Sequence, residues 1–228
     1  GDLSPLVWSH RLNLPRRTVL LSSLAVFAPH WASAQNQPLP GASVVDSVAL
    51  YVVPTDGVAE QAAAQVARAL SQDTGLWVKA SLWVPPGPLA PLPGGQQFAG
   101  EDYLALGSAV AKRLQDAGPR TYFIVLTDRD INARSQNFRF QFSMHSPLQR
   151  TAVLSVARLL TAKDGSPAPG EVVGSRVQKM LMRTVGEMRL GWQRTSDPAD
   201  LMYAPILSVA DIDGMDLVSS VRARLPAR

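Results

Sequence analysis

The sequence predicts an α/β domain with a mixed sheet and flanking helices, and three observations lead to this fold class. Residues 48–53, 58–70 and 76–84 alternate as strand, helix and strand, an order that favours parallel strands joined by a crossover. Residues 121–127 (TYFIVLT) are apolar nearly throughout, which is typical of a central strand covered on both faces. From 173 to 188, apolar residues recur at spacings of three and four, which predicts an amphipathic helix.

The segments between these elements complete the predicted frame. Residues 85–95 (PPGPLAPLPGG) predict a rigid surface loop, because proline cannot continue a helix or a central strand. A second helix is predicted over 102–117, and the alternation at 138–142 (FRFQF) predicts an edge strand. Residues 152–160 (AVLSVARLL) are apolar enough for a strand or a helix. A loop is predicted over 164–170 (DGSPAPG), just before the long helix.

The long helix and the segment after it organise the rest of the chain. Gly191 follows the last periodic residue, where a helix commonly ends through a left-handed glycine. A polar loop comes next, then Met202 in an apolar context and the start of another helix. The apolar face of the long helix carries Val173, Val177, Leu181, Val185 and Met188.

Composition limits the function classes. With 46% hydrophobic residues, the chain can build a real core in a single domain over residues 48–228. The chain has 22 basic and 18 acidic residues; residues 1–34 hold three arginines and one aspartate, which leaves 19 against 17. This near balance argues against nucleic-acid binding. No P-loop or dinucleotide glycine motif is present, which argues against nucleotides, and the lack of cysteine excludes thiolate chemistry.

The first 34 residues are predicted to be an export signal. Arg16 and Arg17 precede an apolar run at 19–28, and Ala32-Ser33-Ala34 matches an A-x-A cleavage pattern. The paired arginines resemble a twin-arginine signal, with general secretion as the alternative. The run is too short for a permanent membrane anchor. Residues 35–47 are predicted to be a linker. The alternative interpretation of residues 1–34 is a disordered N-terminal extension.

Several segments carry a family resemblance through their shared order. They are GQQFAGEDYL at 95–104, VLTDRDI at 125–131, FRFQFS at 138–143 and VLSVARL at 153–159. Together with the long helix they resemble the archaemetzincins, a family of metzincin zinc peptidases, over roughly residues 48–220. The resemblance implies a zincin-like α/β (α+β) fold, in which an active-site-type helix precedes a small lobe with a methionine turn.

The zinc-binding pattern of that family is H-E-x-x-H-x-x-G-x-x-H-C-x4-C-x-M. It can be placed with its glycine on Gly191 and its methionine on Met202 without a gap. In this register the three zinc histidines fall on Thr184, Met188 and Arg194, and the glutamate falls on Val185. The resemblance therefore implies a peptidase frame in which every metal ligand is replaced.

The replaced residues are unsuited to zinc hydrolysis, which needs two histidines four residues apart, a third ligand and a carboxylate base. A hydroxyl at Thr184 and a thioether at Met188 are poor ligands for Zn²⁺, and Arg194 is a permanent cation. After residues 1–34, His145 is the only histidine. We therefore expect no catalytic residue at these positions, no metal and no cofactor; zinc is expected only if this assignment is wrong.

Other charged residues offer weaker candidates. Asp128 and Asp130 follow the predicted central strand and form an alternative acid site, with turn capping as the other interpretation. We expect Glu187 to be a solvated helix charge and His145 to lie in a turn. Three acidic residues are predicted to cap and flank the last helix: Asp211, Asp213 and Asp216.

These observations predict an exported archaemetzincin-like protein, periplasmic or secreted, that binds a peptide or an envelope protein as a monomer and without catalysis. The alternative is an active peptidase or hydrolase with a divergent zinc or carboxylate site. A third hypothesis is an assembly or ligand-binding module on a generic α/β frame.

Overall fold

The computed structural model describes residues 48–225. The predicted export signal and linker lie outside the described residues. Within the described part, no helix is both long and apolar enough to cross a membrane.

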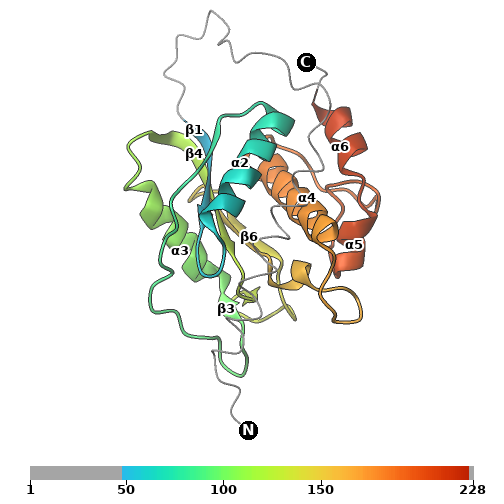
Figure 1. Cartoon of the computed structure of the whole chain (residues 1–228), viewed down its shortest axis with the longest axis horizontal. Coiled ribbons are helices and arrows are strands. Elements are labelled where there is room, and N and C mark those ends of the chain that lie inside the picture. The colour runs from blue at the N-terminus through green and yellow to red at the C-terminus, as the bar shows by residue number, and fades with distance from the viewer. Residues whose placement is uncertain (1–47, 226–228) are drawn as a thin grey trace, which may run out of the picture.

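A five-stranded mixed sheet forms the centre of the fold (Figure 1), with strand order β2-β1-β4-β7-β6. The first four strands in this order are parallel to one another, and β6 pairs antiparallel with β7 at one edge. The strands are β1 (Val48–Pro54), β2 (Val78–Ala80), β4 (Ala117–Thr127), β6 (Ser143–Ser146) and β7 (Thr151–Ser155). A separate parallel pair joins β3 (Phe98–Ala99) to β5 (Ile131–Asn132).

Two predictions about the strands are confirmed. The strands β1 and β2, which flank the first predicted helix, pair in parallel, and β4 lies in the middle of the sheet. Along β4, Phe123 and Val125 face one core while Ile124 and Leu126 face the other. This two-sided burial explains why the segment is apolar nearly throughout.

Two strand predictions need correction. The edge strand is β6 and not residues 138–142, because side chains occupy the carbonyls of that segment: Asn132 donates to Phe138, and Gln97 donates to Arg139. The second predicted strand is shorter than expected. Trp77 and Leu82, on either side of β2, are 50% and 77% exposed. The apolar side chains that suggested a longer strand are therefore at the surface and not in the core.

Helices cover both faces of the sheet (Figure 1). On one side lies α3 (Gly100–Ala111), and on the other lie α2 (Glu60–Thr74) and α4 (Gly170–Arg189). The α3 helix ends six residues earlier than predicted, since the chain turns and enters β4 at Ala117. Between β7 and α4, residues 152–160 combine both predicted possibilities, with a strand followed by the 3-10 helix η1 (Ala157–Leu160).

The segment after α4 forms a small C-terminal lobe with its own core. It contains α5 (Val209–Gly214) and α6 (Leu217–Arg224), which lie beyond α4 in Figure 1. Asp216 caps α6, the last helix, as predicted, whereas Asp211 completes a capping box on the preceding helix α5 and Asp213 forms an ion pair with Arg176. The buried residues of this lobe core are Met182, Trp192, Leu201, Met202 and Met215.

Buried cations on α4 attach this lobe to the helix. Arg176 forms a bidentate ion pair with Asp213 and donates to the carbonyls of two residues near η1. Lys179 donates to the last carbonyls of α5, and Arg183 donates to the carbonyl of Leu201. Burial lowers the pKa of Lys179 and that of Arg183, which reflects the cost of desolvating both cations. The carbonyl contacts offset part of this cost.

The end of α4 is shaped by one close approach. Gly191 has φ of 70°, which confirms the predicted left-handed end of the helix. The next residue, Trp192, folds back so that its amide donates to the carbonyl of Gly186. A Cβ at Gly186 would lie 2.2 Å from a ring carbon of Trp192. Glycine is therefore required at position 186 for the indole to cover the helix.

We predict that Gly186→Ala lowers the free energy of unfolding by about 1–3 kcal/mol, because the methyl group displaces the Trp192 ring. Urea unfolding monitored by tryptophan fluorescence checks this. Gly214→Ala is the matched control: it also lies in a helix, and its Cβ would meet no atom within 4 Å. An equal loss of stability in both variants would contradict the prediction.

Candidate functional site

The residues at the family's zinc positions on α4 face the protein interior. Thr184 is 1% exposed, and its hydroxyl donates to the carbonyl of Met180. Val185 is buried in the main core, and Met188 packs against the same core. The expected apolar packing of Met188 is therefore confirmed. The Thr184 hydroxyl thus bonds within its own helix, and Met188 makes apolar contacts.

Arg194, which follows α4 in the chain, folds back and contacts Glu187, the residue before Met188 on that helix. Its Nη2 and Nε atoms lie 2.9 and 3.2 Å from Oε1 of Glu187, and its side chain is 61% exposed. From the other side, Nδ1 of His145 lies 3.4 Å from Oε2 of Glu187. The structure thus joins three residues from three segments, which we call the Glu187 cluster: His145 on β6, Glu187 on α4, and Arg194 after the helix.

The carboxylate of Glu187 is stabilised by its contacts with His145 and Arg194. Contact with His145, reinforced by Arg194, lowers the pKa of Glu187 from its ordinary value of 4.5 to about 2, despite partial burial. The side chains of His145 and Glu187 are only 14% and 26% exposed. Two predictions are therefore wrong: Glu187 is not a solvated helix charge, and His145 lies in a strand and not in a turn.

Along β6 itself one edge of the sheet is unpaired beside this cluster; two residues earlier the same edge is closed, because the amide of Gln141 donates to the carbonyl of Ile131. The amide of Ser155 donates to the carbonyl of Phe142. The backbone amides and carbonyls of odd-numbered residues in β7 are therefore directed towards β6. In the antiparallel register Met144 faces Val153, which makes it a hydrogen-bonded position. The amide and carbonyl of Ser143 and of His145 therefore point outward. Among the described strands, only β7 pairs with β6.

The residues at the family positions do not fit a zinc ion. The Thr184 hydroxyl is engaged within its own helix, Met188 is packed in an apolar core, and Arg194 adds a positive charge. A divalent cation needs anionic or neutral nitrogen and oxygen donors that converge on one point. Within residues 48–225, no three His, Cys, Asp or Glu side chains are grouped so that they could hold a metal ion.

The alternative acid pair is divided between two sets of contacts. Asp128 accepts a hydrogen bond from the amide of Gly57, which ties β4 to the turn after β1. Asp130 forms a bidentate pair with Arg158 at 2.6 and 2.9 Å and accepts from Gln97. These contacts describe two loop-fixing carboxylates in separate surroundings. They do not describe carboxylates that share a proton.

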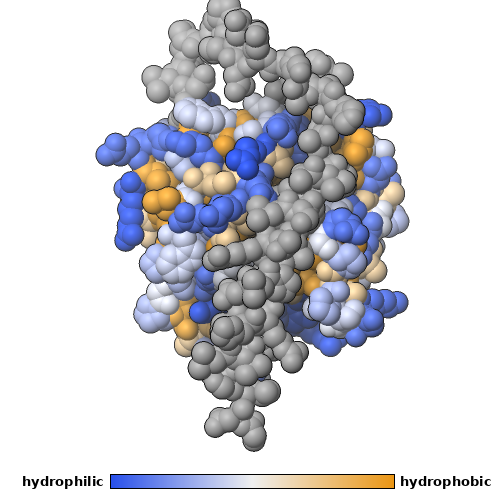
Figure 2. Space-filling model, in the orientation of Figure 1, coloured by the Kyte–Doolittle hydropathy of each residue, from blue (hydrophilic) through white to orange (hydrophobic). Residues whose placement is uncertain are grey.

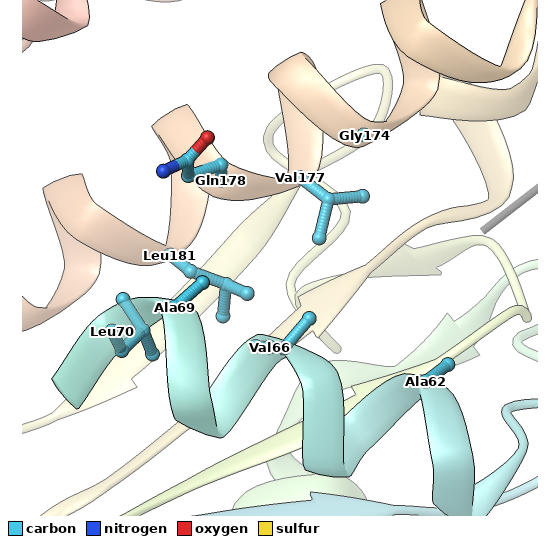
Figure 3. Close-up of a pocket in the computed structure, with 8 residues that line it drawn as sticks. All are labelled: Ala62, Val66, Ala69, Leu70, Gly174, Val177, Gln178 and Leu181. Atoms are coloured by element: carbon cyan, nitrogen blue, oxygen red, sulfur yellow. The ribbon is translucent and has the colours of Figure 1, made fainter. Parts of the chain in front are cut away.

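The best-defined cavity lies elsewhere and is small. Figure 3 shows it between α2 and α4, with apolar side chains from both helices directed into it. Its volume of about 20 Å³ is near that of a single water molecule, so it is a packing gap and not a ligand site. The residues that line this cavity are Ala62, Val66, Ala69, Leu70, Gly174, Val177, Gln178 and Leu181.

The surface facing the viewer in Figure 2 mixes hydrophilic and hydrophobic residues where it is visible.

Comparison with solved structures defines the fold. A zinc-dependent peptidase from Methanocorpusculum labreanum superposes with a TM-score of 0.62 and 16% identity, over 77% of this chain and 98% of that one. Archaemetzincin from Archaeoglobus fulgidus, solved with malonate, gives a TM-score of 0.54 and 22% identity, over 73% of this chain and 91% of that one. This chain has an archaemetzincin-like fold. The zincin-like fold class predicted from sequence is confirmed.

Sequence-level comparison adds nothing to this, since no protein-family model matches the chain and no curated protein matches it. Within the archaemetzincin-like fold, the Glu187 cluster was missed by sequence reasoning. His145 and Glu187 are 42 positions apart, and a lone histidine in a short polar segment gives no signal of its partner. Met202 is fully buried in the lobe core.

We predict that Glu187→Gln lowers the free energy of unfolding at pH 7 by about 1–3 kcal/mol, since the variant loses the carboxylate charge that Arg194 and His145 contact. The folded-state pKa is depressed, so this stability is fully present above pH 4.5 and is lost as the pH falls from 4.5 towards 2. The difference between wild type and variant should shrink over that range in urea unfolding.

The exposed Glu171 in the first turn of the same helix supplies the control. Glu171→Gln should change the unfolding free energy by no more than about 0.5 kcal/mol. A Glu187→Gln effect that is equally small at pH 7, or that does not change below pH 4.5, would show that the Glu187 cluster contributes no charge-based stability.

Proposed function

We propose that this protein is an exported, non-catalytic relative of the archaemetzincins that binds an extended peptide segment. The observation that carries the proposal is the open edge of β6 beside the Glu187 cluster. An extended peptide can add to such an edge as a further strand, with backbone hydrogen bonds giving affinity. The outward amides and carbonyls of Ser143 and His145 supply the donors and acceptors for this pairing.

The loss of catalysis follows from the side chains at the family's zinc positions. Both comparison proteins are described as a zinc-dependent peptidase or an archaemetzincin, which gives this fold a peptidase precedent. Here a hydroxyl, a thioether and a guanidinium occupy the three ligand positions of the matching register. Without a metal to lower the pKa of a bound water, no hydroxide is generated at neutral pH. The protein would then hold a peptide without cleaving it.

We predict that the purified protein, incubated with excess ZnCl₂ and dialysed, retains far less than one equivalent of zinc by mass spectrometry. A triple variant, Thr184→His, Met188→His and Arg194→His, places imidazoles at the three positions of the register and should retain about one equivalent. One tightly held equivalent in the wild type would end the non-metal proposal. A folded triple variant that holds no zinc would show that these three positions do not converge.

We predict that a bound peptide protects the amides of Ser143 and His145 from hydrogen exchange, because these amides point to the open edge. The amide of Met144, already directed at β7, should change little and serves as the internal reference. The probe is an end-blocked pentapeptide of valine and threonine with a central glutamate, followed by two-dimensional NMR. No gain of protection at Ser143 and His145 with saturating peptide would contradict the proposal.

Ser143→Pro gives the matched variant for this experiment. It removes one outward N–H and no bond to β7, so an edge strand can tolerate it. Peptide affinity should fall while the circular dichroism spectrum is retained. Met144→Pro removes a ladder bond to β7 and should instead destabilise the fold.

A further inference from the structure

Arg194 is the most adaptable member of the Glu187 cluster. Its side chain is 61% exposed, while that of His145 is 14% exposed and is fixed by its place in β6. An exposed ion pair contributes little net stability, so Arg194 can exchange Glu187 for another carboxylate at little cost. His145 would then remain in contact with Glu187.

Positive charge is in excess around Glu187. Arg183, one helical turn before it, is buried and donates to a carbonyl and not to a carboxylate. The nearby Asp200 is already paired with Arg224 at 2.9 Å. Glu187 therefore faces two guanidinium groups, that of Arg194 and the more distant one of Arg183, while the neighbouring Asp200 is engaged elsewhere. A ligand that brings a negative charge would correct this imbalance.

The geometry of β6 places one ligand side chain at the cluster. Residues paired across adjacent strands carry their side chains on the same face of the sheet. The side chain of His145 lies on the face that carries α4, where it contacts Glu187. A peptide residue paired with His145 across the open edge would direct its side chain to that face, next to Glu187 and Arg194.

We infer that the peptide bound at β6 carries an aspartate or glutamate at the position paired with His145, and that Arg194 selects it. This inference rests on the proposed function and names its ligand class. The guanidinium is suited to the role because its planar fork can bind both oxygens of a carboxylate. Glu187 acts as the internal competitor that holds Arg194 in place until a ligand carboxylate arrives.

The test compares two labelled, end-blocked pentapeptides of valine and threonine that differ only in a central glutamate or glutamine. Fluorescence anisotropy at low salt should show the glutamate peptide binding about tenfold more tightly, the size expected of one charge-assisted hydrogen bond. The preference should weaken in 0.5 M NaCl, since exposed charges are screened.

Four variants, one of them a control, separate the roles. Arg194→Gln should abolish the glutamate preference, whereas Arg68→Gln, which removes an equal charge from an exposed position on α2, should leave it unchanged. Arg194→Lys should keep part of the preference, because a point charge lacks the fork. Glu187→Gln should tighten binding of the glutamate peptide several-fold, because it removes the competing carboxylate.

The outcomes are distinguishable. If both peptides bind equally and Arg194→Gln changes nothing, the peptide-binding function stands and the acidic preference is wrong. Weaker binding of the glutamate peptide by Glu187→Gln, with the variant folded by circular dichroism, would show that Glu187 recruits a cationic ligand and would overturn the inference. If neither peptide binds, the proposed function fails and this inference fails with it.

Discussion

The structure depends on one helix that is buried on nearly every side. The apolar face of α4 lies against the sheet and α2, and its other side carries Arg176, Lys179 and Arg183 into the C-terminal lobe. Burial of these cations is costly unless their protons are accepted, and the carbonyls near Thr161, Ile212 and Leu201 accept them. The lobe is therefore fixed to the helix by directional bonds as well as by its apolar core.

This attachment determines where the chain goes after α4. Gly191 reverses its direction, Trp192 covers Gly186, and Arg194 comes back to Glu187. The same path brings Met202 into the lobe core. The return follows the packing of Trp192 on Gly186 and the contact of Arg194 with Glu187. A side chain at position 194 will lie beside the end of α4 as long as the indole of Trp192 can pack on glycine.

The other half of the site comes from the sheet. As the antiparallel edge strand, β6 has backbone groups that alternate between β7 and the open edge. The same residue, His145, offers its backbone outward and its side chain to Glu187. Backbone pairing and side-chain selection are thus separate properties of adjacent atoms. In the proposed complex, this separation lets the strand pair with the backbone of any extended peptide while one side chain selects the charge of the ligand.

The sequence by itself determined the fold class and the position of its main elements. Apolar periodicity predicted α4, the continuous apolar run predicted the central strand β4, and Gly191 predicted where the helix ends. These signals are local, because burial on one or two faces imposes a spacing that can be counted along the chain.

Only the tertiary structure decided which charged groups meet. The edge strand moved from the alternating residues 138–142 to Ser143–Ser146, because side chains of Gln97 and Asn132 took the carbonyls of the expected strand. The basic side of α4 gave no sign in the sequence that it would be buried. His145, Glu187 and Arg194 meet through a sheet edge, a helix and a return loop. Contacts between segments far apart in sequence depend on the packing of the whole domain, and no local pattern encodes them.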